Sequence, residues 1–119
     1  MKKKNVFLIC PIRNIPDLYR DAIKDEVAYL EQQYNVYYPE RDTNQNDTSG
    51  LKICNDNKTA MKKADLVYVI WDGKSQGVLF DLGMAFAMNK KIRTLVGYMP
   101  RMTTGKSFQN MIFEWEEMR

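Results

Sequence analysis

The chain of 119 residues contains no histidine. Histidine is the side chain that titrates near neutral pH and the commonest metal ligand, so its absence removes the usual general base and the usual zinc site. The two cysteines, Cys10 and Cys54, are far apart and have no Cys-x-x-Cys spacing, which argues against a zinc ribbon and a disulfide framework. We therefore expect chemistry based on carboxylates, hydroxyls or amides, with neither a metal nor a cofactor.

The chain also lacks a long hydrophobic run. No stretch approaches the roughly 20 apolar residues that cross a bilayer, and the apolar run that follows three lysines at positions 2–4 stops at Pro11, too early for a signal peptide. Those lysines account for the net charge of +3, so the rest of the chain has no basic stripe of the kind that binds nucleic acid. We expect a cytoplasmic protein that binds neither membrane nor nucleic acid.

Known phosphate-binding patterns are missing as well. Gly-Lys-Ser occurs at 73–75 and 105–107, but neither triplet has the glycine that a P-loop needs five residues earlier. The dinucleotide fingerprint Gly-x-Gly-x-x-Gly is also absent. A response-regulator receiver domain would need acidic residues just after its first strand, where this chain has Pro11 and Arg13. The sequence thus argues against all three classes.

What is present is the composition of a globular domain, with 45% hydrophobic and 28% charged residues. Apolar runs predict strands at 6–10, 36–38, 65–71 and 91–96, and amphipathic spacing predicts helices at 17–34, 51–63, 78–89 and from Ser107 onward. Residues 40–50 include no apolar side chain and form a polar loop of a length that is often functional.

Strands that alternate with helices predict right-handed βαβ units. We expect one domain over residues 1–119 with an α/β fold, a small flavodoxin-like or Rossmann-like sandwich whose parallel sheet has four to five strands. Ligands bind such sheets beyond the carboxyl ends of the strands. The candidate site loops are therefore those after Cys10, Tyr38, Trp71 and Val96.

The segment from Asp65 to Ile92 is the most informative. It contains an aliphatic strand, then Gly77-Val78-Leu79-Phe80-Asp81-Leu82-Gly83-Met84-Ala85, then Lys90-Lys91-Ile92. This order resembles the nucleoside 2-deoxyribosyltransferase superfamily, including its deoxynucleoside 5′-monophosphate N-glycosidase branch. The first strand with Pro11-Ile12-Arg13, and Gln109-Asn110-Met111-Ile112 near the end, are similar to the same family, so the resemblance covers most of the chain.

The resemblance implies an enzyme that cleaves or exchanges the N-glycosidic bond of a nucleoside or its 5′-monophosphate. Asp81 falls where the family has a nucleophilic glutamate, and a carboxylate there would attack the anomeric carbon to form a glycosyl-enzyme. Asp56, Asp72 or a carboxyl of the polar loop would supply the proton for the leaving base. Without the resemblance, Asp81 complements a helix dipole and Asp72 forms a turn with Gly73.

The resemblance also assigns binding residues. A family aspartate falls on Asn57, Arg13 matches an arginine that would bind a 5′-phosphate, and Ser75 stands where relatives touch the sugar or phosphate. The expected substrate-binding residues are Phe7, Arg13, Asn57, Ser75, Gly77, Gln109 and Asn110. On ordinary structural grounds, Arg13 would be a solvated loop residue and Phe7 a core residue.

The family further implies a homodimer or larger homo-oligomer in which Asn110 or Gln109 reaches the neighbouring subunit's site. An apolar stripe on the last predicted helix, formed by Phe108, Met111, Ile112 and Trp115, fits either an interface or a helix that covers the sheet. Because Asp81 and Asn57 both depart from the family's acidic pattern, the alternative function is a non-catalytic nucleotide-binding module of the same fold.

Overall fold

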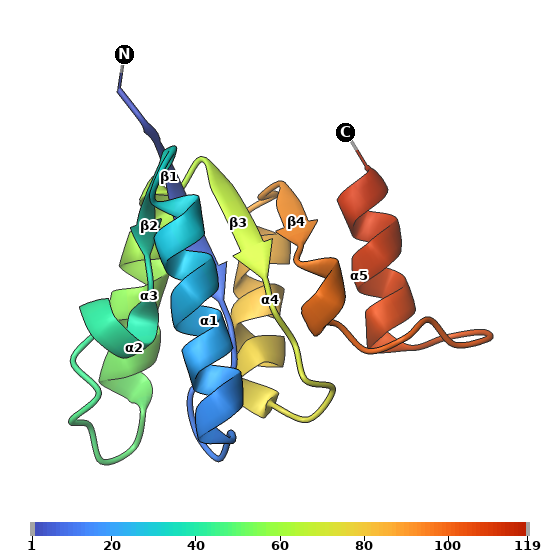
Figure 1. Ribbon diagram of the computed structural model, residues 1–119, viewed down its shortest axis with the longest axis horizontal. Helices are drawn as coiled ribbons and strands as arrows, with labels where there is room; N and C mark the ends of the chain where they lie inside the picture. The colour runs from blue at the N-terminus through green and yellow to red at the C-terminus, as the bar shows by residue number, and fades with distance from the viewer. Residues whose placement is uncertain (1, 119) are drawn as a thin grey trace.

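The computed structural model describes residues 2–118, apart from the side chain of Val96, and has the alternating strands and helices that the sequence predicts. The strands are β1 (Lys4–Ile9), β2 (Tyr34–Tyr37), β3 (Leu66–Val69) and β4 (Ile92–Thr94). The helices are α1 (Asp17–Leu30), α2 (Pro39–Asp42), α3 (Leu51–Lys63), α4 (Gln76–Ala87) and α5 (Phe108–Glu117), and η1 (Val96–Tyr98) is a 3₁₀ turn. Figure 1 shows the strands running side by side with their carboxyl ends at the lower edge.

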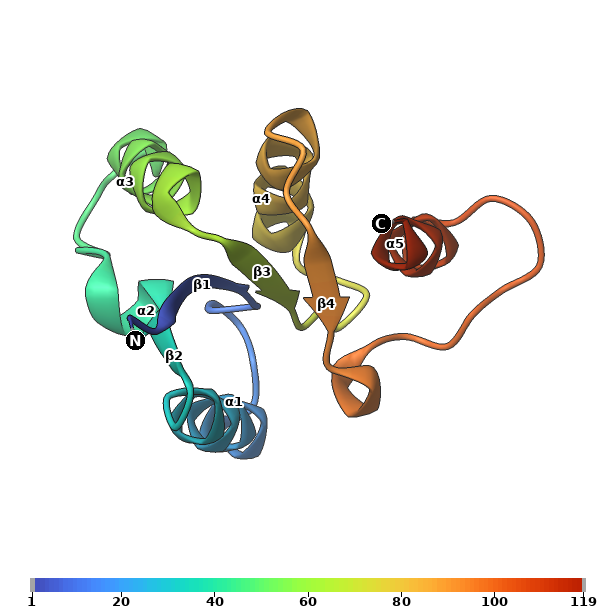
Figure 2. The same ribbon diagram turned by 90° about the horizontal axis from the view of Figure 1, so that it is seen from above.

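The strands described in residues 2–118 form one sheet in the order β2-β1-β3-β4, and every pairing is parallel. Figure 2 shows α1 on one face of this sheet, α3 and α4 on the other, and α5 beside β4 at the edge. Ile112 and Trp115 of α5 join the apolar core on the face of α3 and α4. The expected flavodoxin-like α/β sandwich is therefore confirmed. Because the crossover from β1 leads through α1 and that from β3 through α4 on the opposite face, the switch point lies between the carboxyl ends of β1 and β3.

Each face of the sheet has its own apolar core. Phe7 and Ile9 of β1 pack toward α3, α4 and α5, whereas Val6 and Leu8 pack toward α1. Alternate side chains of a strand point to opposite faces, and a strand that is covered on both faces reads as a continuous apolar run. This explains why β1 shows no alternation between polar and apolar residues.

Some element boundaries differ from the prediction. The first helix ends at Leu30 rather than near residue 34, because a turn follows and Tyr34 already belongs to β2. A short helix, α2, starts at Pro39 and reaches into the predicted polar loop, since proline suits a first helical turn. The helix after β3 begins at Gln76 instead of Val78, so its second turn, not its first, carries Asp81.

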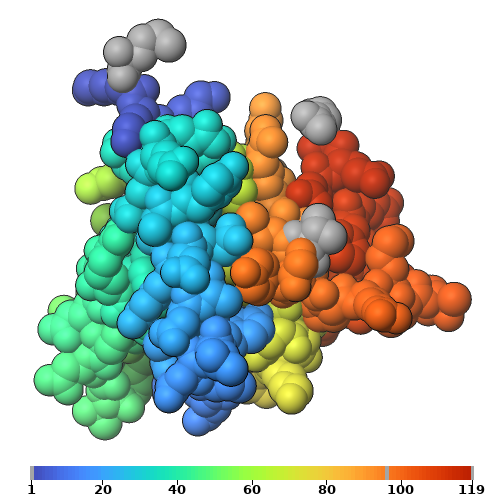
Figure 3. Space-filling view, in the orientation of Figure 1, coloured from blue at the N-terminus to red at the C-terminus, as the bar shows by residue number. Residues whose placement is uncertain are grey.

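The loop between η1 and α5 stands out from the body of the molecule, as Figure 3 shows in orange. The amide of Asn110 in α5 holds this loop. Its Oδ1 accepts from the Thr103 backbone N–H at 2.9 Å, and its Nδ2 donates to the carbonyls of Thr103 and Gly105 at 2.6 and 2.8 Å. Among the described residues, no helix is long and apolar enough to span a bilayer.

Candidate active site

The carboxyl edge of the sheet gathers ionisable groups around the end of β1, where Cys10 is buried. Burial and the charges of Glu40 and Asp81 raise the pKa of the Cys10 thiol far above its usual value. Burial and the charges of Asp81 and Asp47 also raise the pKa of Cys54, near the start of α3. Asp81 therefore lies close to both the end of β1 and the start of α3.

Asp81 has the most unusual setting of the carboxylates. It shares the inward-facing stripe of α4 with Val78, Leu82 and Ala85, which are buried against the sheet. Burial alone raises the pKa of Asp81 from 3.8 to about 7, without an ion pair or hydrogen bond from another described residue to offset it.

This setting bears on the role of Asp81. The helix dipole acts mainly within the first turn, and Asp81 lies beyond it, so the dipole does not explain its position. Placing an unpaired carboxylate against an apolar core is costly. Carboxyl groups whose pKa is raised in this way occur preferentially at reactive sites.

The loop from β3 to α4 is shaped by Asp72 and Ser75. Asp72 Oδ1 accepts from the backbone N–H groups of Lys74 and Ser75 at 2.9 and 2.8 Å, which is the turn geometry that the Asp-Gly sequence predicts. Ser75 Oγ caps α4 by accepting from the N–H of Val78 at 3.3 Å. A Cβ on Gly77 would meet only Ser75 Oγ, at 3.9 Å, so the chain itself leaves space beside this turn for a ligand.

Asp56, a candidate acid, and Asn57, a candidate binding residue, are neighbours on α3 that differ in burial. Asp56 is half-buried, forms an ion pair with Lys52 at 3.6 Å, and has a side chain that is 44% exposed. Asn57, one residue later, is turned inward and is only 4% exposed. Successive helical residues are rotated by about 100°, so Asp56 does not share the inward direction of Asn57.

The loop from β1 to α1 carries Arg13, which is exposed and forms no ion pair with another described residue. Arg20 fixes the base of this loop by donating to the carbonyl of Ile12 at 2.6 Å and to Glu40 at 2.8 Å. Tyr38 donates to the other oxygen of Glu40 at 2.9 Å. The guanidinium of Arg20 is thus occupied by contacts within the chain, whereas the guanidinium of Arg13 is available to bind an anion.

Three of the expected binding residues are engaged by contacts within this chain. Phe7 is fully buried and stacks on Tyr37 with ring centroids 5.5 Å apart, so it lies in the core rather than on a binding surface. Gln109 donates to the carbonyl of Arg101 at 3.2 Å. Asn110 is engaged by the projecting loop, so the side-chain amides of both residues have hydrogen-bond partners within their own chain.

Sequence reasoning missed several residues of this edge. Burial, with the charges of Asp72 and Cys10, raises the pKa of Tyr19 to about 12, which places the start of α1 beside the loop after β3. Glu40 and Thr43 belong to the polar segment after β2, whose composition flagged the loop but not these residues. Within residues 2–118, no cluster of three His, Cys, Asp or Glu side chains could hold a metal ion.

Comparison with known proteins agrees with this architecture. The family model described as nucleoside 2-deoxyribosyltransferase matches residues 6–114. No curated protein matches the chain significantly. A solved structure of a 2-desoxiribosyltransferase from Leishmania mexicana superposes with a TM-score of 0.60 at 20% identity, covering 89% of this chain and 80% of that one. At this identity, the superposition shows the fold alone.

Proposed function

The chain belongs to the nucleoside 2-deoxyribosyltransferase family, and from that premise we propose that it cleaves or exchanges the N-glycosidic bond of a deoxynucleoside or its 5′-monophosphate. The observation that carries this proposal is Asp81, an unpaired carboxylate on the buried stripe of α4 beside the end of β1. A carboxylate nucleophile needs a free lone pair that can reach the anomeric carbon, and Asp81 has no protein cation bound to its oxygens among the described residues.

The reaction would proceed in two steps. An oxygen of Asp81 bonds to C1′ while the C1′–N bond breaks, and the electron pair of that bond stays on the base. Water or a second base then attacks C1′ and releases the carboxylate. Only the ionised form of Asp81 can attack, so the fraction of active protein rises with pH through about 7.

The direct test is release of free base from a panel of deoxynucleosides and their 5′-monophosphates, separated by chromatography, with and without an acceptor base. We expect release from at least one member and none above background with Asp81→Asn. Binding of these compounds without release of base would favour the non-catalytic module, which the aspartate in place of glutamate at position 81 and the amide at Asn57 make the second candidate.

Arg13 is expected to bind the 5′-phosphate, because its guanidinium is exposed without a described ion-pair partner on a loop at the switch point and is suited to bidentate contact with phosphate. Arg13→Ala should weaken binding of a monophosphate by roughly 10-fold to 100-fold and leave binding of the nucleoside nearly unchanged. Calorimetry with both ligands measures the difference. Arg13→Lys is the matched variant, and equal losses for the two ligands would contradict the assignment.

A homodimer is expected to form through α4 and α5. Asp81 is the only charged residue of α4, and Phe86, Phe108 and Met111 stay exposed on the two helices although Phe86 packs edge-on against Trp115. Exposed apolar surface of this kind marks interfaces. Light scattering at micromolar concentration should give twice the chain mass. Met111→Lys should shift the equilibrium toward the monomer without changing the circular dichroism spectrum.

Sharing of the site between subunits can be measured separately. Mixing inactive Asp81→Ala with Asn110→Ala chains should restore activity, because one site of each mixed dimer would contain both residues. No recovery despite confirmed subunit exchange would argue that Asn110 acts only within its own chain, where it holds the loop at Thr103 and Gly105.

A further inference from the structure

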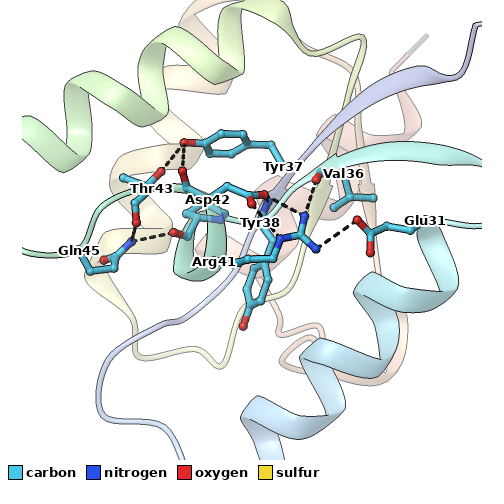
Figure 4. A network of polar contacts seen from close by, with 9 residues as sticks. Glu31, Val36, Tyr37, Tyr38, Arg41, Asp42, Thr43 and Gln45 are labelled. Carbon is cyan, nitrogen blue, oxygen red and sulfur yellow. Dashed lines mark hydrogen bonds and ion pairs between the residues drawn. The ribbon is translucent and has the colours of Figure 1, made fainter.

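A chain of buried hydrogen bonds links the polar segment after β2 to α3. Thr43 and Asn57 are each 4% exposed, and Thr43 Oγ1 donates to Asn57 Oδ1 at 2.7 Å. The hydroxyl of Tyr37 lies 2.5 Å from Thr43 Oγ1, and Figure 4 shows Tyr37 pointing toward Thr43. Neither Tyr37 nor Thr43 takes part in the two proposed steps at Asp81.

The hydroxyl protons give this chain a direction. Thr43 has one proton and gives it to Asn57 Oδ1, so its oxygen accepts in the contact with Tyr37. The Tyr37 hydroxyl also has one proton and two neighbours, and it gives that proton to the nearer Thr43 oxygen rather than to the Asp42 carbonyl at 3.3 Å. The carbonyl side of the Asn57 amide is therefore occupied, and its Nδ2 group, with two donors, faces the other way. Among the buried side-chain atoms described, only the Tyr19 hydroxyl is both enclosed and unpartnered. Nδ2 of Asn57, which has no hydrogen bond within residues 2–118, therefore borders open space.

Asp81 lies near the same helix, α3. Asn57 lies one turn after Cys54, and the charge of Asp81 contributes to the raised pKa of the Cys54 thiol. Both α3 and α4 start at the carboxyl edge of the sheet and lie side by side (Figures 1 and 2). Asn57 is the seventh residue of α3 and Asp81 the sixth of α4, so at about 1.5 Å per residue the two side chains start from similar depths.

We propose that Thr43 orients Asn57 to donate an Nδ2 hydrogen bond to the leaving base, which departs as a hydrogen-bonded anion. This inference rests on the proposed function. As Asp81 bonds to C1′, the C1′–N electron pair passes to the base, and water protonates the base after departure. An amide stabilises this charge but transfers no proton. The site therefore selects bases that have an acceptor atom and form stable anions, and Thr43 is a positioning residue.

The test compares 2′-deoxyribosides of 5-substituted uracils, which have similar shapes but differ in the acidity of the base. The parent chain should release the most acidic base at least on the order of 10-fold faster than the least acidic one. In Asn57→Asp, a carboxyl that can transfer a proton should flatten this dependence by at least a factor of about three. The slope of log kcat against base acidity is the readout, which a purely structural role would not move.

Thr43 is tested by two variants of matched size. Thr43→Val removes the hydroxyl while keeping the shape and should lower kcat by roughly 10-fold with little change in KM. Thr43→Ser keeps the donor and should restore most of the rate. Base release with the same slope in the parent and Asn57→Asp, or equal kcat in Thr43→Val and Thr43→Ser, would overturn this inference alone. Absence of base release by the parent chain would overturn it together with the proposed function.

Discussion

Asp81→Asn is expected to lower the rate of base release by at least about 10³-fold, the largest effect of any substitution considered, because an amide cannot form the glycosyl ester and binding does not compensate for a lost nucleophile. The affinity for a nucleotide should stay within a few-fold, since Asn keeps the size of the side chain. Rapid-quench measurement of kcat and calorimetric measurement of Kd separate these two quantities.

Asp81→Glu is the informative companion. It restores the longer carboxylate that the family carries at this position, so it should retain or raise the activity, and mass spectrometry of the acid-quenched variant should detect an added deoxyribosyl group. In the active chain, kcat/KM should rise with pH to a plateau, with an apparent pKa near 7 set by the burial of Asp81. Near-normal turnover by Asp81→Asn would remove Asp81 from the mechanism.

Most of the fold is predictable from local patterns, because each strand and helix carries its own signal. The continuous apolar run of β1 and the spacing of Ile23, Val27 and Leu30 in α1 identify a buried strand and a one-sided helix without knowledge of their neighbours. The helix α2 carries no such pattern, since it is a single turn started by Pro39 in an otherwise polar segment. Its formation depends on the strand that precedes it.

The site is less predictable, because its chemistry depends on contacts between distant residues. The sequence places Asp81 at the carboxyl edge, but its lack of a partner follows only from the packing of α4. The bond from Thr43 to Asn57 spans 14 residues of the chain, and no local pattern indicates it. Asp56 is equally acidic in the sequence, and only the structure shows that it pairs with Lys52 whereas Asp81 has no described partner.

Asp81 should also make the stability of the chain depend on pH. The carboxyl ionises near pH 7 in the folded chain and near 3.8 when unfolded, so between these values the folded chain binds more protons than the unfolded one. Stability then falls as pH rises through this window and reaches its lower level above pH 7. If the whole pKa shift of Asp81 were expressed in folding stability, the chain would lose ~4 kcal/mol of stability at pH 8. Partial solvent access of Asp81 makes this loss smaller.

Asp81→Asn removes this ionisation and should therefore stabilise the chain by about 2–4 kcal/mol at pH 8, with the gain shrinking toward zero near pH 4. Urea unfolding followed by circular dichroism at pH 4.5, 6 and 8 measures the difference. Asp56→Asn is the matched control, because it removes an exposed carboxylate from the neighbouring helix and should produce no gain that widens with pH. If the Asp81→Asn gain were the same at all three pH values, Asp81 would be ionised in the folded chain throughout, and burial would not hold its pKa near neutral pH.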